Sequence, residues 1–133
     1  MKKVISILTL AIVIVSCSKS KDDAASPSPA SQTSIAGFWK GTYDVSGSYA
    51  FLFRPDGTLR VYSNNADTAL AKKGEGVYQL TADKKGIDGT YTYFSTGTHY
   101  SISAGITNEM KEMKGQYKQL DGNAAGTFTI NKQ

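Results

Sequence analysis

Apolar and polar residues alternate along most of the chain from residue 37 onward. In the first such segment, residues 37–45, the alternation places Trp39, Tyr43 and Val45 on one face and polar side chains on the other. Because successive side chains of a strand point to opposite faces, this pattern predicts β-structure. The same reasoning predicts seven further strands at residues 49–53, 58–62, 75–81, 88–94, 98–104, 113–120 and 125–131. Residues 108–114 are the single candidate for a helix, which would end at Gly115.

The connections between these predicted strands are too short for parallel pairing. Pro55, Asp56 and Gly57 have the chemistry of a tight turn and predict a hairpin between the second and third strands. Parallel strands need crossovers of about a dozen residues or more, which this segment of the chain lacks. We therefore expect an all-β fold, an antiparallel up-and-down eight-stranded meander barrel, with a β-sandwich as the structural alternative.

A glycine two residues before an aromatic residue recurs in the predicted strands. Residues i and i+2 of a strand share a face, so each glycine leaves space beside a large ring and lets the strand bend. A ring on a neighbouring strand can also cover the missing side chain. Closure of such a bent sheet removes its exposed edges, which favours the barrel. The glycines of this repeat are Gly37, Gly41, Gly76, Gly89, Gly115 and Gly126.

The N-terminus has the pattern of an export signal. Lys2 and Lys3 precede an apolar run, residues 4–15, that is shorter than the about 20 residues a membrane span requires. Ser16 and Cys17 follow it and resemble the lipobox of bacterial lipoproteins, which implies a signal peptide at residues 1–16 and lipidation of Cys17. An ordinary cleaved signal with a free cysteine is the alternative. A lone thiol in an oxidising compartment has no partner, which favours lipidation.

Residues 17–34 predict a lipidated cysteine followed by a disordered tether, because Ser, Lys, Asp, Ala and Pro cannot bury apolar area. Acyl chains such as palmitate contribute about 0.8 kcal/mol per CH₂ and would anchor the chain without a membrane-spanning helix. Lys21, Asp22 and Asp23 resemble the acidic export signals of Bacteroidetes surface lipoproteins. We expect a protein lipid-anchored to the bacterial outer membrane, facing the periplasm or the cell surface, with the folded domain at residues 35–133.

The folded segment resembles a known family. Gly37, Phe38 and Trp39 are similar to the Gly-x-Trp of lipocalins, and residues 35–132 resemble the small lipocalin-like domains of Bacteroidetes lipoproteins. The matching segments are residues 37–41, 51–58 and 126–132. The resemblance implies a barrel and an envelope location, but no particular ligand. The Thr-Asp-Tyr motif of lipocalins is absent, as is the late arginine that packs on the tryptophan, with Lys132 nearest its place.

Composition and charge exclude several functions. The chain has 15 basic and 11 acidic residues, and loss of a signal that holds Lys2 and Lys3 leaves 13 basic residues, so we expect no nucleic-acid partner. One cysteine and one histidine exclude a disulfide framework and a multi-histidine metal site. The alternation places His99 on the outer face. The carboxylates are scattered, and we expect no catalysis, cofactor or metal.

Two functional hypotheses follow from the aromatic residues. A barrel of this size either encloses a small hydrophobic ligand or is filled by its own rings. In the first case the protein is a carrier, and in the second it is a monomeric interaction domain. Such a domain would bind an envelope protein or glycan through its outer face or through residues 63–73. An empty apolar interior above about 300 Å³ would favour the carrier. The candidates to line the cavity or fill the core are Trp39, Tyr43, Phe51, Phe53, Tyr78, Tyr91, Tyr93 and Phe128.

Overall fold

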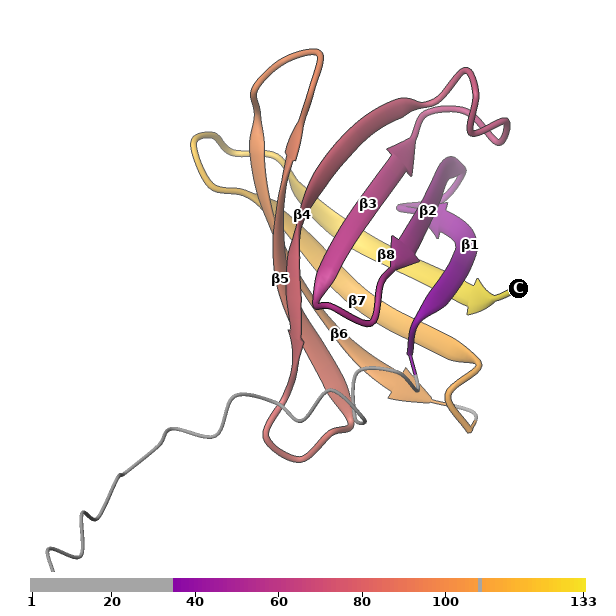
Figure 1. The fold of residues 1–133 in the computed structure, drawn as a ribbon. Helices are drawn as coiled ribbons and strands as arrows, with labels where there is room; N and C mark the ends of the chain where they lie inside the picture. Colours follow the sequence, from indigo (N-terminus) through magenta and orange to yellow (C-terminus); the bar gives the residue numbers. More distant parts are fainter. Residues whose placement is uncertain (1–34, 108) are drawn as a thin grey trace, which may run out of the picture.

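The computed structural model describes residues 35–107 and 109–133, which form a closed antiparallel barrel of eight strands (Figure 1). The predicted all-β up-and-down fold is confirmed, and the sandwich alternative is wrong. The proposed signal peptide, Cys17 and the tether lie outside the described residues. The strands are β1 (Gly37–Tyr43), β2 (Gly47–Phe53), β3 (Thr58–Ser63), β4 (Lys72–Leu80), β5 (Gly86–Tyr93), β6 (His99–Thr107), β7 (Glu112–Gln119) and β8 (Ala125–Lys132).

Each strand pairs with the strands before and after it in the sequence, and β1 pairs with β8 to close the barrel. The closing ladder runs from the Trp39–Lys132 pair to the Tyr43–Phe128 pair. Closure satisfies the backbone groups that an open sheet would leave at its edges. None of the residues 35–107 and 109–133 belongs to a helix long and apolar enough to cross a membrane.

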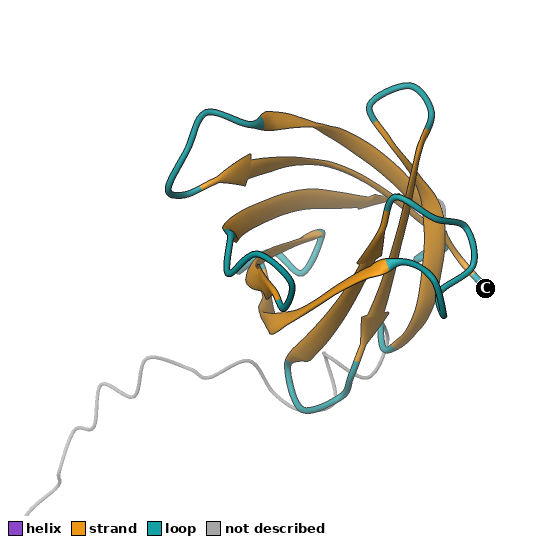
Figure 2. Ribbon diagram, turned by 90° about the horizontal axis from the view of Figure 1, so that it is seen from above, coloured by secondary structure: helices purple, strands orange, loops and turns teal. Residues whose placement is uncertain are grey.

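The meander gives the barrel two different ends. At one end, which we call the base, β1 begins, β8 ends and the turns after β2, β4 and β6 lie. At the other end, which we call the mouth, lie the connections after β1, β3, β5 and β7. Figure 1 shows the loop after β3 and the hairpin after β5 at the top, with the turn after β4 at the bottom. Figure 2, the view from above, shows the teal loops joining the ends of the orange strands.

β4 and β6 extend further than predicted, since β4 begins at Lys72 rather than at residue 75 and β6 ends at Thr107 rather than at residue 104. Two further predictions are wrong. The first strand ends at Tyr43, because Asp44 adopts a φ of 49° and begins a turn that leaves Val45 95% exposed rather than on the inner face. The helix proposed for residues 108–114 is absent from the described part of that range. Glu109 and Met110 have φ values of 53° and 68°, which a right-handed helix cannot contain, and β7 begins at Glu112.

The base is closed by Trp39, whose side chain is fully buried. Its Nε1 donates a hydrogen bond to the carbonyl oxygen of Ile35 at 2.9 Å, and its ring meets Phe53 edge-on at 6.3 Å. The ammonium of Lys132 lies 5.8 Å from the centre of the indole. In lipocalins a late arginine packs on the tryptophan, and this chain lacks that arginine. Here Lys132 makes a cation–π contact with Trp39 instead.

Glycines in the strands allow close approach between neighbouring strands. A Cβ atom added to Gly76 would collide with the carbonyl oxygen of Thr90 and the Cα of Tyr91 on β5. We expected a ring on a neighbouring strand to cover the space beside each glycine. Five of the glycines do pair with an aromatic residue on the adjacent strand. The pairs are Gly41–Tyr49, Gly76–Tyr91, Gly89–Tyr78, Gly115–Phe128 and Gly126–Tyr117.

Candidate ligand site at the mouth of the barrel

The aromatic residues predicted to line or fill the barrel come together in one core. Six of the eight are buried, and Tyr43 and Tyr93 pack half-buried against the same cluster. Phe51 lies at its centre, stacked on Phe53 at 5.5 Å and within 5.7 Å of Phe128. The most deeply buried side chains are all apolar, so the interior is filled toward the base. They are Trp39, Phe51, Phe53, Ile35, Leu59, Ile87, Met113, Ile130 and Val61.

Three inward-facing tyrosines are missing from the predicted set. Tyr49 is 3% exposed and contacts Tyr43, Phe51 and Phe128. Tyr100 and Tyr117 are half-buried against the core. The signal for Tyr49 and Tyr100 is present in the sequence, since Tyr49 alternates with Phe51 and Tyr100 with Ile102. His99, between two inward positions, is exposed.

A cavity of about 290 Å³ opens at the mouth, above this filled core. Its lining combines aromatic rings with hydroxyl groups, and Lys72 is the one charged residue of the lining. The cavity is therefore smaller and more polar than the apolar interior that a carrier of a hydrophobic ligand requires. The residues that line it are Tyr43, Tyr49, Ser63, Asn64, Lys72, Tyr91, Tyr93, Thr96, Thr98, Tyr100, Tyr117 and Ala124.

The tyrosine rings around the cavity hold one another in place. Tyr100 stacks on Tyr91 at 5.4 Å, with an angle of 12° between the rings, and meets Tyr93 and Tyr117 edge-on. Tyr43 meets Tyr49 at 5.5 Å and Tyr117 at 6.0 Å, both edge-on. Such contacts are worth about 0.5–1.5 kcal/mol each beyond burial. The walls of the cavity are thus preformed.

Most of the phenol hydroxyls are also fixed by hydrogen bonds. The hydroxyls of Tyr49 and Tyr91 lie 2.6 Å apart, and Tyr93 donates to Ser63 at 2.7 Å. Tyr43 donates to Asn64 at 2.6 Å, and Tyr117 donates to Asp44 at 2.9 Å. The hydroxyl of Tyr100 has no hydrogen-bond partner among the described residues, and these contain no buried side-chain polar atom without one. The Tyr100 hydroxyl is therefore solvated and open to a ligand.

Lys72 reaches the cavity because of the strand register. It stands opposite Ser63 in the β3–β4 ladder, and residues directly opposite each other share a face. Ser63 is buried and accepts the hydrogen bond from Tyr93, so Lys72 begins on the inner side of the barrel wall. The ammonium of Lys72 forms no ion pair and no hydrogen bond with another described residue. The neighbouring Lys73 faces outward and bonds to the carbonyl of Ala69.

Burial keeps these phenols neutral. It raises the pKa of Tyr49, Tyr91 and Tyr93 above the usual value for tyrosine. It also raises the pKa of Tyr117 to about 12, helped by the hydrogen bond to Asp44. At neutral pH each phenol therefore retains its proton and can donate a hydrogen bond.

These raised pKa values predict a loss of stability at alkaline pH. An unfolded tyrosine ionises near pH 10, whereas the folded phenols resist ionisation, so their stabilisation is complete below about pH 10 and is lost as the pH rises further. We expect the denaturant midpoint to fall steeply between about pH 10 and about pH 11, with the last part of the tyrosinate absorbance appearing together with unfolding. Ionisation of all eight tyrosines near pH 10 in the folded protein would contradict the buried positions of these rings.

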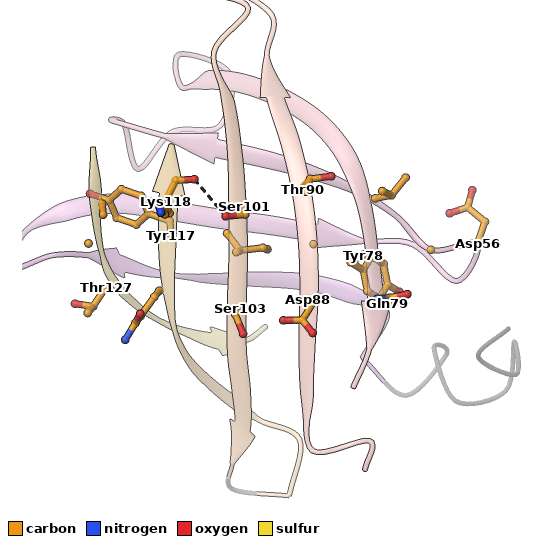
Figure 3. A pocket seen from close by; sticks show the side chains of 17 residues that line it. Asp56, Tyr78, Gln79, Asp88, Thr90, Ser101, Ser103, Tyr117, Lys118 and Thr127 are labelled. Atoms are coloured by element: carbon orange, nitrogen blue, oxygen red, sulfur yellow. Dashed lines mark hydrogen bonds between the residues drawn. The ribbon is translucent and has the colours of Figure 1, made fainter. Parts of the chain in front are cut away.

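A second, wider hollow lies on the outer face of β4 to β8 (Figure 3). It measures about 1130 Å³ and is lined by two rows of mostly polar side chains that the register aligns across the five strands. Apart from rings that belong to the core, such as Tyr78, it offers hydroxyls, amides, the exposed Val77 and three charged side chains, two of them carboxylates and one an ammonium. We interpret it as the solvated outer surface of a bent sheet. The rows are Val77–Thr90–Ser101–Lys118–Ala125 and Gln79–Asp88–Ser103–Gln116–Thr127.

The loops around the mouth carry exposed apolar side chains. Val45, Leu70, Phe94 and Leu120 lie one in each of the four connections at this end and are 57–95% exposed. The loop after β3, within the segment singled out from the sequence, is held to β1 by a hydrogen bond from Lys40 to the carbonyl of Ala66. Single exposed apolar residues are common, but their gathering at one end of a domain marks a potential contact surface.

The fold and the cavity define a small closed barrel with a filled base and a tyrosine-lined mouth. Among the described residues, histidine, cysteine and carboxylate side chains do not gather in a group of three or more that could hold a metal. Comparison of the chain with protein-family models, with curated proteins and with solved structures finds no match in any of the three.

Proposed function

We propose that this chain is a lipid-anchored, lipocalin-like envelope protein with a non-catalytic binding domain, and that a small ligand binds at the mouth of the barrel. The observation that carries the proposal is the preformed cavity of about 290 Å³, in which the Tyr100 hydroxyl and the Lys72 ammonium have no partner in the described protein. Small-molecule sites combine aromatic and apolar walls with a few placed polar groups, and the mouth has this combination at a volume close to the lower limit of such sites, about 300 Å³.

The carrier hypothesis in its original form, with a hydrophobic ligand enclosed in the barrel, is less well supported. Phe51, Phe53 and Trp39 occupy the interior that such a ligand would need. Displacing any of them would cost several kcal/mol of packing. A ligand that binds against the tyrosines at the mouth requires no such rearrangement of the core.

The site can be tested by filling it. Thr98 lines the mouth cavity and Thr90 lines the outer hollow, so Thr98→Trp and Thr90→Trp form a matched pair. Calorimetric titrations with one-ring anionic, neutral and cationic compounds would first establish which class saturates the protein. We expect Thr98→Trp to abolish that binding and Thr90→Trp to leave it unchanged. Loss of binding in Thr90→Trp alone, or saturation by none of the compounds, would contradict a ligand site at the mouth.

Contact with an envelope protein is the second candidate, favoured by the apolar loop tips. A photo-crosslinking residue at Phe94 would lie at the mouth, whereas the same residue at Val77, also exposed, would lie on the outer face of β4. We expect a crosslinked product of one defined size from position 94 only, formed in intact cells. Equal products from both positions would indicate nonspecific contact.

The anchor rests on the sequence around Cys17, which lies outside the described residues. We expect Cys17→Ser to release the protein from the membrane fraction, because the acyl chains are then not attached. Detergent partitioning and mass spectrometry of the mature N-terminus measure this. An unmodified N-terminus beginning at Lys19 or later would contradict lipidation.

A further inference from the structure

We propose that the ligand of the mouth is a small planar aromatic carboxylate, bound with its ring against the tyrosines and its carboxylate at Lys72 and Tyr100. This inference rests on the proposed function and adds the chemical class of the ligand. Three features of the cavity lead to it: its charge, its supply of hydrogen-bond donors and the orientation of its rings.

The charge of the lining favours an anion. Lys72 is its one charged residue. Asp44, which is not part of the lining, accepts hydrogen bonds from the hydroxyl of Tyr117 and from the backbone N–H of Thr127. The ammonium of Lys72 lacks an ion-pair partner among the residues that the structure describes. A cation placed in this cavity would meet a like charge, whereas a carboxylate would gain a charge-assisted hydrogen bond.

The polar groups of the cavity also favour an acceptor. Tyr93 already donates to Ser63 and Tyr43 already donates to Asn64, whereas the Tyr100 hydroxyl and the Lys72 ammonium have no hydrogen-bond partner among the described residues. A carboxylate accepts hydrogen bonds at both of its oxygens and can use these two donors together. Tyr91 and Tyr93 keep their protons well above neutral pH because burial raises the pKa of both, so these walls do not add negative charge.

The rings of the mouth select a flat partner of limited size. Tyr91 and Tyr100 are stacked, and the ring edges of Tyr93 and Tyr117 meet the Tyr100 ring. A further aromatic ring can join such a cluster in the same stacked or edge-on geometries. At about 290 Å³ the cavity suits a small ring system, and a long acyl chain would need the space that Phe51 and Phe53 occupy.

The test compares benzoate with benzamide, which has the same ring and shape but no charge. Isothermal titration of the purified protein at low salt should show saturable binding of benzoate at a stoichiometry near one, and binding of benzamide about tenfold or more weaker. Benzoate binding should weaken as salt is added, because the Lys72 end of the site is exposed to solvent. Cyclohexanecarboxylate, which keeps the charge but lacks the aromatic ring, should also bind more weakly than benzoate.

Two variants separate the roles of the donors. Lys72→Gln should reduce benzoate affinity to that of benzamide, whereas Lys118→Gln, which removes the same charge from the outer face, should leave it unchanged. Tyr100→Phe keeps the stacked ring and should cost about fivefold in affinity. Equal binding of benzoate and benzamide, with both lost in Thr98→Trp, would overturn the anionic class but keep the site. Binding of neither compound, or equal losses in Lys72→Gln and Lys118→Gln, would overturn the inference entirely.

Discussion

Replacing Trp39 with alanine is expected to lower the free energy of unfolding by roughly 3–5 kcal/mol, the usual cost of deleting a buried large aromatic side chain. Trp39 is fully buried at the base, and its loss removes the hydrogen bond to Ile35, the contact with Phe53 and the cation–π contact with Lys132. A small domain has about 5–15 kcal/mol of total stability, so the variant should be close to unfolding at ambient temperature. Chemical denaturation monitored by circular dichroism measures the change.

Phe38 provides the matched control for this variant. It precedes Trp39 in β1, faces outward and contacts the ring of Tyr62 at 6.0 Å. We expect Phe38→Ala to cost about 1 kcal/mol, because one half-buried aromatic pair on the outer face is lost and no internal cavity forms. If the two variants unfolded at the same denaturant concentration, the assignment of Trp39 to the inside of β1 would be incorrect.

The second large effect is expected at Gly76, where an added methyl group meets backbone rather than a movable side chain. Gly76→Ala should destabilise the barrel by roughly 1–3 kcal/mol or more, since β4 and β5 must separate to accept it. The collision involves the carbonyl oxygen of Thr90 and the Cα of Tyr91. Because Tyr91 lines the mouth cavity, the variant should also lower the affinity for any ligand that binds there.

Gly105 is the control, since it lies in β6 and an added Cβ would have no atom within 4 Å. Gly105→Ala should be neutral or stabilise by about 0.4–1 kcal/mol, because alanine restricts the unfolded chain. Similar losses for both alanine variants would show that strand glycines are required for a reason other than close strand approach.

The sequence predicted the architecture because the barrel obeys local rules along nearly its whole length. Alternation around Trp39, Phe51 and Phe128 reports which side of each strand is inside, and short turns such as Pro55–Gly57 allow only antiparallel neighbours. The errors occur where a local backbone preference interrupts the alternation. Asp44 and Met110 adopt positive φ, which ends the strand pattern at Val45 and excludes the helix before β7.

The site could be predicted only in part. The alternation predicts that Tyr43, Tyr91 and Tyr93 point inward, yet the same pattern does not say which rings fill the core and which face an opening. That difference depends on the height of each residue in the barrel, which is set by the register between strands. The inward position of Lys72 also depends on the register, because Lys72 pairs with Ser63. The loop between these two residues is too long for the sequence to predict that pairing.

The most direct test of the central claim is an NMR titration of the isotope-labelled protein with benzoate, in which every amide signal reports its own surroundings. We expect the signals of Lys72, Thr98 and Tyr100 to shift along the same binding curve, as a single site for benzoate requires. Those of Thr90, Ser103 and Lys118, on the outer face, should stay in place. Shifts confined to the outer face would contradict a ligand site built from the tyrosines, and no saturable shift at the mouth would contradict an aromatic carboxylate as its ligand.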